Sequence, residues 1–510
     1  MTTTKRLISG TAASWTRIAV TIVAQILFVP VYLTHWNINI YGLWLGIQAL
    51  LSLLTIIEFG HHNFLEFEFL KIGSSQPKKI AINLWSGVAL AITLGLLINL
   101  IIIILVVSGT VESLFANASS LPKSLIHEAG YVLLILSVVN TLTTSAGGVL
   151  GRALSPFGYY SRMCWWGVWT AVLTTCAPVV AIALGADFLR AGLVLGVGTL
   201  LCNIPLFIDV FRILKKENII HKRISIKVGL KNFASSLVIS LKDLLESFRQ
   251  QGIRVILIPI VGPAGLTAFS TTRTGANLAL QGLNTITNPL MPELMRFLNE
   301  KDQNKMEVSF GTIWFIVIAL LSPGMIILQS FVGPLFIIWT KGKIPFDPLL
   351  FATLSLNVLI YALSQPAIAV VRGNNLLKPQ ILISTISASV LVFALFVVVP
   401  IKGIIGAGLA LMISEVISCF CYFYIAKRWL NINGLSWPKR GALLAATAVC
   451  ITTLSLFGIV YFPALKIWIC LISFLLLAWN TLQYYSSLPI FFKLRVKNMV
   501  SKVRVKHHTL

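Results

Sequence analysis

The chain has 510 residues, of which 57% are hydrophobic and only 11% are charged, and its mean hydropathy is +0.89. A soluble domain carries about 25% charged residues, so this composition excludes one and indicates an integral membrane protein. The net charge of +24 is concentrated in short segments between apolar runs, which is typical of cytoplasmic loops and disfavours a nucleic-acid partner.

Apolar runs of about 20 residues alternate with short polar breaks, which predicts an all-α polytopic fold rather than a barrel. The first run has no small-residue cleavage site, so we expect it to be an uncleaved span. The cysteines show no disulfide or metal-site spacing, and we expect no metal and no cofactor. Fourteen spans are predicted, at residues 11–33, 40–60, 82–107, 128–150, 164–184, 191–211, 233–261, 266–290, 309–332, 349–371, 380–399, 404–426, 441–461 and 465–485.

The lysines and arginines between the spans are distributed unevenly. Segments predicted to be cytoplasmic hold 29 of them, and segments on the other side hold six. This asymmetry predicts a multi-pass protein with both termini in the cytoplasm. The basic run at residues 212–231 reads as a cytoplasmic linker that lies on anionic lipid.

The first two spans each carry polar residues on one helix face. Arg17, Thr21 and Gln25 follow one another at four-residue spacing, and Glu58 ends the stripe of the second span. Arg17 and Glu58 fall at similar depth if the chain folds back at residues 36–38. Either an ion pair between them or a role in a cavity would explain this placement.

The seventh and eighth spans predict a hairpin over residues 237–289, with its turn at residues 262–265. The polar face of the first arm holds Asp243, Glu246, Gln250 and Arg254, and that of the second holds Arg273, Asn277, Gln281, Asn284 and Asn288. Reflection about the turn places Arg254 and Arg273 at one depth. A charge at the bilayer centre costs about 2.5 to 3.5 kcal/mol, so these stripes favour a water-filled cavity. The alternative is internal ion pairing of Lys242 and Arg249 with the acidic residues.

Similar segments recur six spans apart, at Gly151-Arg152-Ala153 and Val371-Arg372-Gly373. An even number of intervening spans predicts two parallel repeats, an architecture of transporters. We therefore expect an N-terminal lobe with its linker at residues 1–225 and a C-terminal lobe at 226–430. Two accessory spans at 431–490 and a basic cytoplasmic tail at 491–510 complete the chain.

Several segments resemble the multidrug/oligosaccharidyl-lipid/polysaccharide (MOP) superfamily, and within it the Wzx-like O-antigen flippases. They are Gly10-Thr11-Ala12, Tyr41-Gly42-Leu43-Trp44, residues 260–269, residues 288–294 and residues 403–414. The resemblance implies two pseudo-symmetric six-helix lobes around a central cationic cavity lined by spans one, two, seven and eight. Arg17 is the one charged residue of span one, a departure from the lipid II flippases that favours O-antigen or a related polysaccharide.

The function implied by the resemblance is ion-coupled transport of an undecaprenyl-pyrophosphate-linked oligosaccharide across the inner membrane by alternating access. Arginines would hold the pyrophosphate through forked hydrogen bonds, and amides would meet sugar hydroxyls. The expected substrate site comprises Arg17, Gln25, Arg249, Arg254, Arg273, Asn277, Gln281 and Asn284. A proton or sodium ion would act through Glu58, Asp243, Glu246 or Glu415. We expect a monomer, surrounded by membrane lipid and in possible contact with other polysaccharide-assembly proteins.

Two other functions are weighed against this one. A MATE-like multidrug or cation antiporter should have an acidic cavity, whereas spans seven and eight hold four basic residues and two acidic ones. A polymerase should have a long outer loop with arginines, and an acyltransferase should bury a histidine. The longest outer loop, 108–127, has only Lys123, and His61, His62 and His127 lie near predicted helix ends, where they read as interfacial. A transporter is therefore expected rather than an enzyme.

Overall fold

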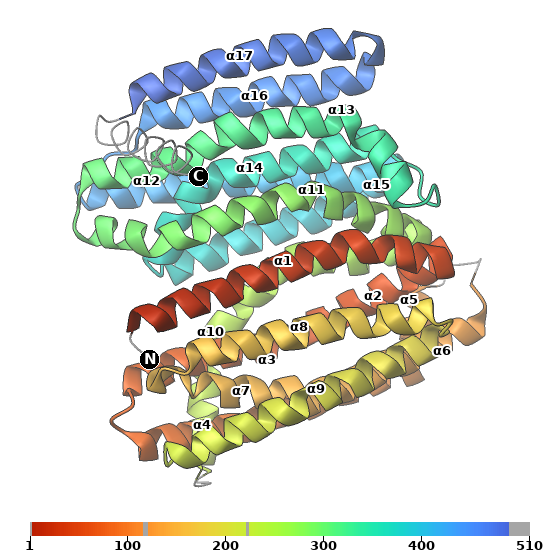
Figure 1. Ribbon diagram of the computed structural model, residues 1–510, viewed down its shortest axis with the longest axis vertical. Helices are drawn as coiled ribbons and strands as arrows, with labels where there is room; N and C mark the ends of the chain where they lie inside the picture. Colours follow the sequence, from red (N-terminus) through yellow and green to blue (C-terminus); the bar gives the residue numbers. More distant parts are fainter. Residues whose placement is uncertain (1–2, 116–120, 221–223, 489–510) are drawn as a thin grey trace, which may run out of the picture. The chain divides into compact units, whose positions relative to one another are not determined.

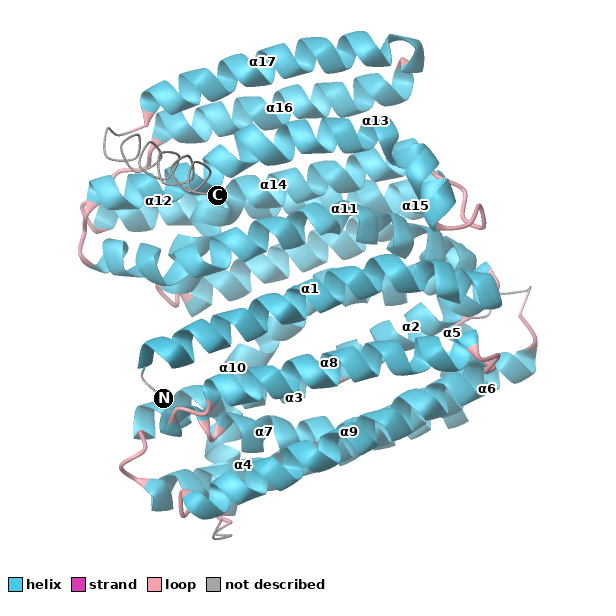
Figure 2. Ribbon diagram, in the orientation of Figure 1, coloured by secondary structure: helices cyan, strands magenta, loops and turns pink. Residues whose placement is uncertain are grey.

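The computed structural model describes residues 3–115, 121–220 and 224–488, apart from the side chains of residues 3–8, 284–289 and 292. Within these residues every regular element is helical (Figure 2). The predicted all-α fold is confirmed. The chain divides into two compact units, one of Met1–Thr271 with Trp339–Pro345 and one of Thr272–Ile338 with Phe346–Leu510.

The first unit begins with the long helix α1, which packs against α8, and α8 packs in turn against α9 (Figure 1). Helix α3 lies against α10, and α4 lies against α6. The helices are α1 (Thr3–His35), α2 (Ile38–Leu54), α3 (Ile56–Ile72), α4 (Pro77–Val107), α5 (Thr110–Leu114), α6 (Lys123–Asn140), α7 (Ala146–Arg152), α8 (Tyr160–Ala183), α9 (Phe188–Lys216) and α10 (Ile226–Ser247). A π-helical turn at Thr141–Ser145 joins α6 to α7, and another at Phe248–Gly252 follows α10.

The second unit is built on α14 and α15, which pack closely together, and α16 packs on α14 and α17. A buried aromatic cluster that includes Phe310, Trp314 and Trp437 forms part of its core. Its helices are α12 (Gln303–Ile316), α13 (Ser322–Trp339), α14 (Pro348–Gly373), α15 (Leu377–Ile432), α16 (Lys439–Tyr461) and α17 (Lys466–Ser487). Helix α11 (Ile253–Asn299) contributes residues to both units.

Eleven helices are long and apolar enough to cross a membrane, and the bent pair of α2 and α3 makes twelve. Helix α15 contains two of the predicted spans, and α11 contains the eighth predicted span and the last nine residues of the seventh, residues 253–261. Their helical dihedral angles are interrupted at Gly262 (φ 72°, ψ 176°) and at Gly403 (φ 58°, ψ −140°), where the sequence predicts the turns. Both glycines have positive φ, which side chains with a Cβ adopt only rarely. The helices therefore account for about fourteen spans.

The second predicted span ends too early. Helix α3 bends by 44° from α2 at Thr55 and continues to Ile72, whereas the apolar run ends near residue 60. Polar residues such as Glu66 end the run without ending the helix, because they are satisfied inside the first unit. The prediction of a span limited to residues 40–60 is wrong for this reason.

Exposed apolar side chains identify the surfaces that contact lipid. Leu96, Leu100 and Ile104 of α4 are all more than half exposed, as are Ile467 and Leu475 of α17. Apolar patches of this extent are unstable in water and favourable in a bilayer. The structure is consistent with a multi-pass membrane protein.

Two glycines allow close helix contact in the first unit. A Cβ on Gly42 of α2 would lie 2.0 Å from the carbonyl oxygen of Pro263, and a Cβ on Gly60 of α3 would lie 2.2 Å from Oγ of Ser240. Thr267 adds a hydrogen bond of 2.8 Å to the carbonyl of Ile38. The backbone approach at Gly42 gives a packing reason for the Tyr41-Gly42 segment at the start of α2.

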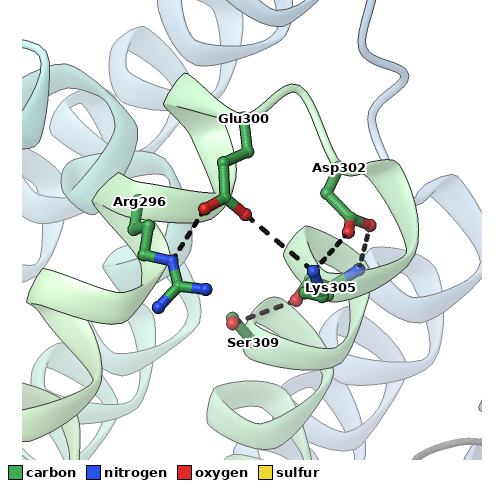
Figure 3. A network of polar contacts seen from close by, with 5 residues as sticks. All are labelled: Arg296, Glu300, Asp302, Lys305 and Ser309. Carbon is green, nitrogen blue, oxygen red and sulfur yellow. Dashed lines mark hydrogen bonds and ion pairs between the residues drawn. The ribbon is translucent and has the colours of Figure 1, made fainter.

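Charged residues stabilise the junction between α11 and α12 (Figure 3). Asp302 accepts a hydrogen bond from the backbone of Lys305 at 3.0 Å and lies 2.8 Å from its ammonium group, while Arg296 donates to Glu300 at 2.7 Å. The hydrogen bond from the Lys305 ammonium group, and after it that from the Lys305 backbone, lowers the pKa of Asp302. Asp302 thus caps the N-terminus of α12, a position that favours a negative charge.

Candidate functional site

The first unit contains a cavity of about 670 Å³ beside α1. Residues of α1 and α8 line much of it, and residues of α3, the π-turn at 141–145, α7 and α9 line the rest, together with Ser155. The lining of α8 runs from Tyr160 to Thr175, which at 1.5 Å per residue is about 22 Å of helix. The cavity is therefore deep enough to hold a ligand larger than a single sugar ring.

Two arginines and one carboxylate supply the charges of the lining. Arg17 of α1 is exposed, and its guanidinium makes no hydrogen bond or ion pair with a residue that the structure describes. Arg152 at the end of α7 is paired, because its Nε lies 3.3 Å from Oε2 of Glu66. The other oxygen of Glu66 accepts a hydrogen bond of 3.3 Å from Ser155. One positive charge, that of Arg17, is thus left to attract an anion.

Hydroxyl groups make up most of the remaining polar lining. They belong to Ser14, Thr21, Thr144, Ser155, Tyr160, Thr170, Thr174 and Thr175. Several donate to the carbonyl four residues earlier in their own helix, as Ser14 does to Gly10 and Thr170 does to Trp166, both at 3.0 Å. A hydroxyl bonded in this way still has lone pairs with which to accept. Such a surface suits a ligand that carries many hydroxyls of its own.

Glycines open the space between these polar groups. Gly147, Gly148, Gly151 and Gly167 all line the cavity. A Cβ on Gly167 would meet nothing within 4 Å, whereas one on Gly148 would lie 2.6 Å from the His62 ring. The glycines on α7 therefore serve two purposes, since they widen the cavity and allow α3 to approach.

A buried carboxylate lies in the same unit, next to the π-turn. Glu58 is 1% exposed, and its Oε2 accepts hydrogen bonds from Ser145 at 2.8 Å and from Asn140 at 3.2 Å. The second oxygen, Oε1, is buried and has no hydrogen-bond partner within the described residues. A π-turn aligns residues five positions apart, which is why both donors face Glu58. The predicted role of Glu58 in ion coupling stays a prediction.

The structure corrects the interpretation of two histidines. His61 and His62 were expected at a membrane interface, but both are fully buried. Nε2 of His62 lies 3.0 Å from the carbonyl oxygen of Ser145, so His62 and Glu58 share Ser145 as a neighbour. The interfacial prediction is wrong because α3 continues into the interior of the unit, so these histidines no longer count against an acyltransferase. His127 does lie on the surface, 3.1 Å from Glu112.

For Arg17 and Glu58 the sequence left two alternatives, an ion pair between them or a role in a cavity. Arg17 and Glu58 make no ion pair, because Arg17 lines the cavity while Glu58 is held by Ser145 and Asn140. Gln25 lies two helical turns beyond Arg17 on α1 and is half-buried. Arg17 lines the cavity of the first unit, and its assignment to the substrate stays a prediction.

A chain of polar contacts joins the cavity to α10. Arg152 donates to Oδ1 of Asn63 at 3.1 Å, and Asn63 donates to Oδ2 of Asp243 at 3.3 Å. Asp243 is also paired with its neighbour Lys242 at 3.1 Å. Asp243, predicted to titrate, therefore has a cation already beside it. Glu246 is half-buried on the same helix.

The predicted arginines of the central hairpin lie in three different settings. Arg249 is half-buried in the π-turn at 248–252. Arg254 donates from Nη1 to Gln251 at 3.2 Å, and its Nε is buried with no hydrogen-bond partner in the described part of the chain. Arg273 is 6% exposed and belongs to the second unit. A joint action of Arg254 and Arg273 on one anion stays a prediction.

The remaining predicted site residues belong to the second unit. Asn277 and Gln281 are half-buried on α11, and Glu415 is buried on α15. The side chain of Asn284 lies outside the described residues. The structure does not test their assignment to the substrate or to the coupling ion.

This cavity of the first unit is lined from spans one, two, four, five and six, and among the described residues only Arg17 of the predicted substrate site lines it; spans seven and eight supply none of its lining residues. A signal for span five was present, since Tyr160, Met163, Gly167, Thr170 and Thr174 recur at alternating spacings of three and four residues and so share one helix face. These residues include no charged side chain, so a search for charged helix faces does not identify them.

No protein family and no curated protein matches the chain in sequence. Solved structures do match its fold. The lipid II flippase MurJ in an inward closed conformation has a TM-score of 0.62 and 17% identity, over 96% of this chain and 100% of that chain. A mutant of the Vibrio cholerae MATE transporter VcmN has a TM-score of 0.56 and 13% identity, over 84% of this chain and 97% of that one. An outward-facing multidrug resistance MATE family transporter of the MOP superfamily also has a TM-score of 0.56, with 15% identity, over 84% and 96%. The chain thus shares its fold with these solved transporters and with this flippase.

Proposed function

We propose that the protein is a flippase for a lipid-linked oligosaccharide, an undecaprenyl-pyrophosphate-linked repeat unit of O-antigen or a related surface polysaccharide. The observation that carries the proposal is the cavity of about 670 Å³ with the unpaired Arg17 and many hydroxyls. The fold shared with the lipid II flippase MurJ and with MATE transporters supports a transporter. By this proposal the repeat unit moves from the cytoplasmic to the periplasmic leaflet of the inner membrane by alternating access.

The chemistry of the cavity fits the polar head of such a substrate. Arg17 provides a planar fork that matches a phosphate or a carboxylate, and it stands in a membrane-spanning helix where a charge is costly unless water or a ligand reaches it. The hydroxyls of α1 and α8 can exchange hydrogen bonds with sugar hydroxyls. The predicted residues Arg249, Arg254, Arg273, Asn277 and Gln281 would serve other stages of the same path.

Ion coupling is assigned to Glu58 first. Its carboxylate is buried, accepts two hydrogen bonds and has one unpartnered oxygen, so binding of a proton or sodium ion there would change the charge inside the first unit. One charge that crosses the membrane yields about 2.3 kcal/mol per 100 mV, enough to shift a two-state equilibrium more than tenfold. Asp243, Glu246 and Glu415 are the secondary candidates.

A MATE-like exporter of cationic drugs is the second candidate function, and the shared fold favours it. The charge of the cavity disfavours a cationic substrate. Its lining holds two arginines and one glutamate, which repels a cation and attracts an anion. A drug exporter would confer resistance to cationic compounds, and a flippase would not.

The test compares Arg17→Ala with Arg190→Ala in a strain that lacks its own copy of the gene. Arg190 is 74% exposed, pairs with Asp187 and lies outside the lining of the cavity, so it controls for loss of an arginine elsewhere in the protein. Loss of a charged hydrogen bond is worth about 1.5 to 3 kcal/mol, so Arg17→Ala should reduce surface polysaccharide about 10- to 100-fold. Lipid-linked repeat units should then accumulate on the cytoplasmic side, while the protein remains in the membrane.

Arg17→Lys should restore transport only in part, because an ammonium group cannot make the planar fork. Normal polysaccharide in Arg17→Ala would refute the role of this cavity. Unchanged polysaccharide in a strain without the protein, together with increased sensitivity to cationic drugs, would assign the protein to drug export instead.

A further inference from the structure

A groove of about 640 Å³ lies in the second unit between the two arms of α15. On the first arm its lining residues step by four, from Lys378 to Leu382 and then to Ile386. On the second arm the lining includes Arg428 and, one turn earlier, Ile425. The groove is thus walled on both sides by one broken helix and belongs entirely to the second unit.

The charge in this groove is confined to one end. Lys378 is the second residue of α15 and Arg428 lies near its last residue, so both stand at the open end of the two arms. The residues further along are apolar, and Leu382 at 57% and Tyr424 at 68% are widely exposed. The groove therefore combines a cationic mouth with a long apolar floor.

Within the described part of the chain, neither Lys378 nor Arg428 is paired with an acidic side chain. Lys378 and Arg428 are exposed and make no hydrogen bond or ion pair with any residue that the structure describes. Trp429, half-buried beside them, lines the same end of the groove. Tryptophan favours the level of the lipid headgroups, so the cationic mouth is expected at that level.

The basic residues at this end belong to segments predicted to be cytoplasmic. The cytoplasmic leaflet is the one that carries anionic lipids, and basic pockets between membrane helices on that side bind their headgroups. The volume of the groove falls within the range of sites that enclose a small ligand.

We propose that this groove binds an anionic phospholipid of the cytoplasmic leaflet. The headgroup phosphate lies between Lys378 and Arg428, and an acyl chain lies against Leu382, Ile386 and Ile425. Such a lipid joins the two arms of α15 on either side of the break at Gly403 and so stabilises their contact. The site is separate from the cavity of the first unit and does not depend on which substrate the protein transports.

Native mass spectrometry of the purified full-length protein in detergent tests this assignment, with phosphatidylglycerol as the probe. The double variant Lys378→Gln/Arg428→Gln should bind phosphatidylglycerol about 30-fold more weakly, which is about 2 kcal/mol, since each basic side chain near anionic lipid contributes about 1 kcal/mol. Lys439→Gln/Arg440→Gln is the matched control, because it removes two exposed cations on the same predicted side and outside the groove.

A second measurement locates the acyl chain. Phosphatidylglycerol with brominated chains should quench tryptophan fluorescence in the wild-type protein, and part of that quenching should be lost in Trp429→Phe. Equal binding of phosphatidylcholine, or equal weakening in the control variant, would overturn the proposal. Binding of undecaprenyl phosphate without binding of phosphatidylglycerol would also overturn it and would assign the groove to the carrier lipid.

Discussion

Gly148 provides a quantitative test of the interior of the first unit. A Cβ at this position would lie 2.6 Å from both Cε1 and Nδ1 of the His62 ring. The ring cannot easily turn away, because it is fully buried and its Nε2 lies 3.0 Å from the carbonyl of Ser145. Gly148→Ala must therefore displace His62, and through Ser145 it should disturb the hydrogen bonds of Glu58.

Gly151 is the matched control on the same short helix. A Cβ there would lie 3.7 Å from the sulfur of Met163, an ordinary contact. Alanine is favoured over glycine in a helix by about 1 kcal/mol at both positions, so that gain cancels in the comparison. Overpacking costs about 1 to 3 kcal/mol, so Gly148→Ala should be less stable than Gly151→Ala by that amount.

Thermal unfolding of the purified variants measures the difference, which should appear as a few degrees in the midpoint. His62→Ala should relieve the clash, so the double variant Gly148→Ala/His62→Ala should lose less stability than the two single changes predict by addition. Equal midpoints for the two glycine variants would refute the placement of His62 against α7.

Three further predictions concern transport and topology. Replacement of either Arg254 or Arg273 by alanine should abolish surface polysaccharide while the protein stays inserted, and normal polysaccharide in the double variant would remove their joint role. Glu58→Gln should leave a folded protein whose transport in vesicles no longer responds to a proton or sodium gradient, and a preserved response would make Glu58 a structural residue. Reporter fusions after Lys343 and after Arg440 should report opposite faces of the membrane because of the uneven charge distribution, and the same face for both would show that the span count between them is wrong.

The all-helical fold and the breaks within α11 and α15 could be predicted because apolar runs and glycines act locally. Gly262 and Gly403 break α11 and α15 where the apolar runs meet, and both have positive φ. The polar stripe that begins at Arg17 indicated a cavity for the same local reason, since its spacing fixes one helix face.

The choice of partner helix was not predictable in the same way. Nothing in the periodicity of α1 specifies that it packs on α8, and the hydroxyls of span five, such as Thr170 and Thr174, therefore went unassigned. His61 and His62 were misplaced because hydropathy measures composition, while their burial depends on the continuation of α3 into the unit.

The π-turn at Thr141–Ser145 also determines which way the side chains of α7 face about the helix axis. A π-turn inserts one residue into an α-helix, and each residue of an α-helix corresponds to about 100° of rotation. A regular α-helix over the same number of residues would lack this adjustment and would turn Gly148 and Arg152 by roughly 100° about its axis. The glycine surface that accommodates His62 and the guanidinium that reaches Glu66 would then face elsewhere, although no residue of either contact had been changed.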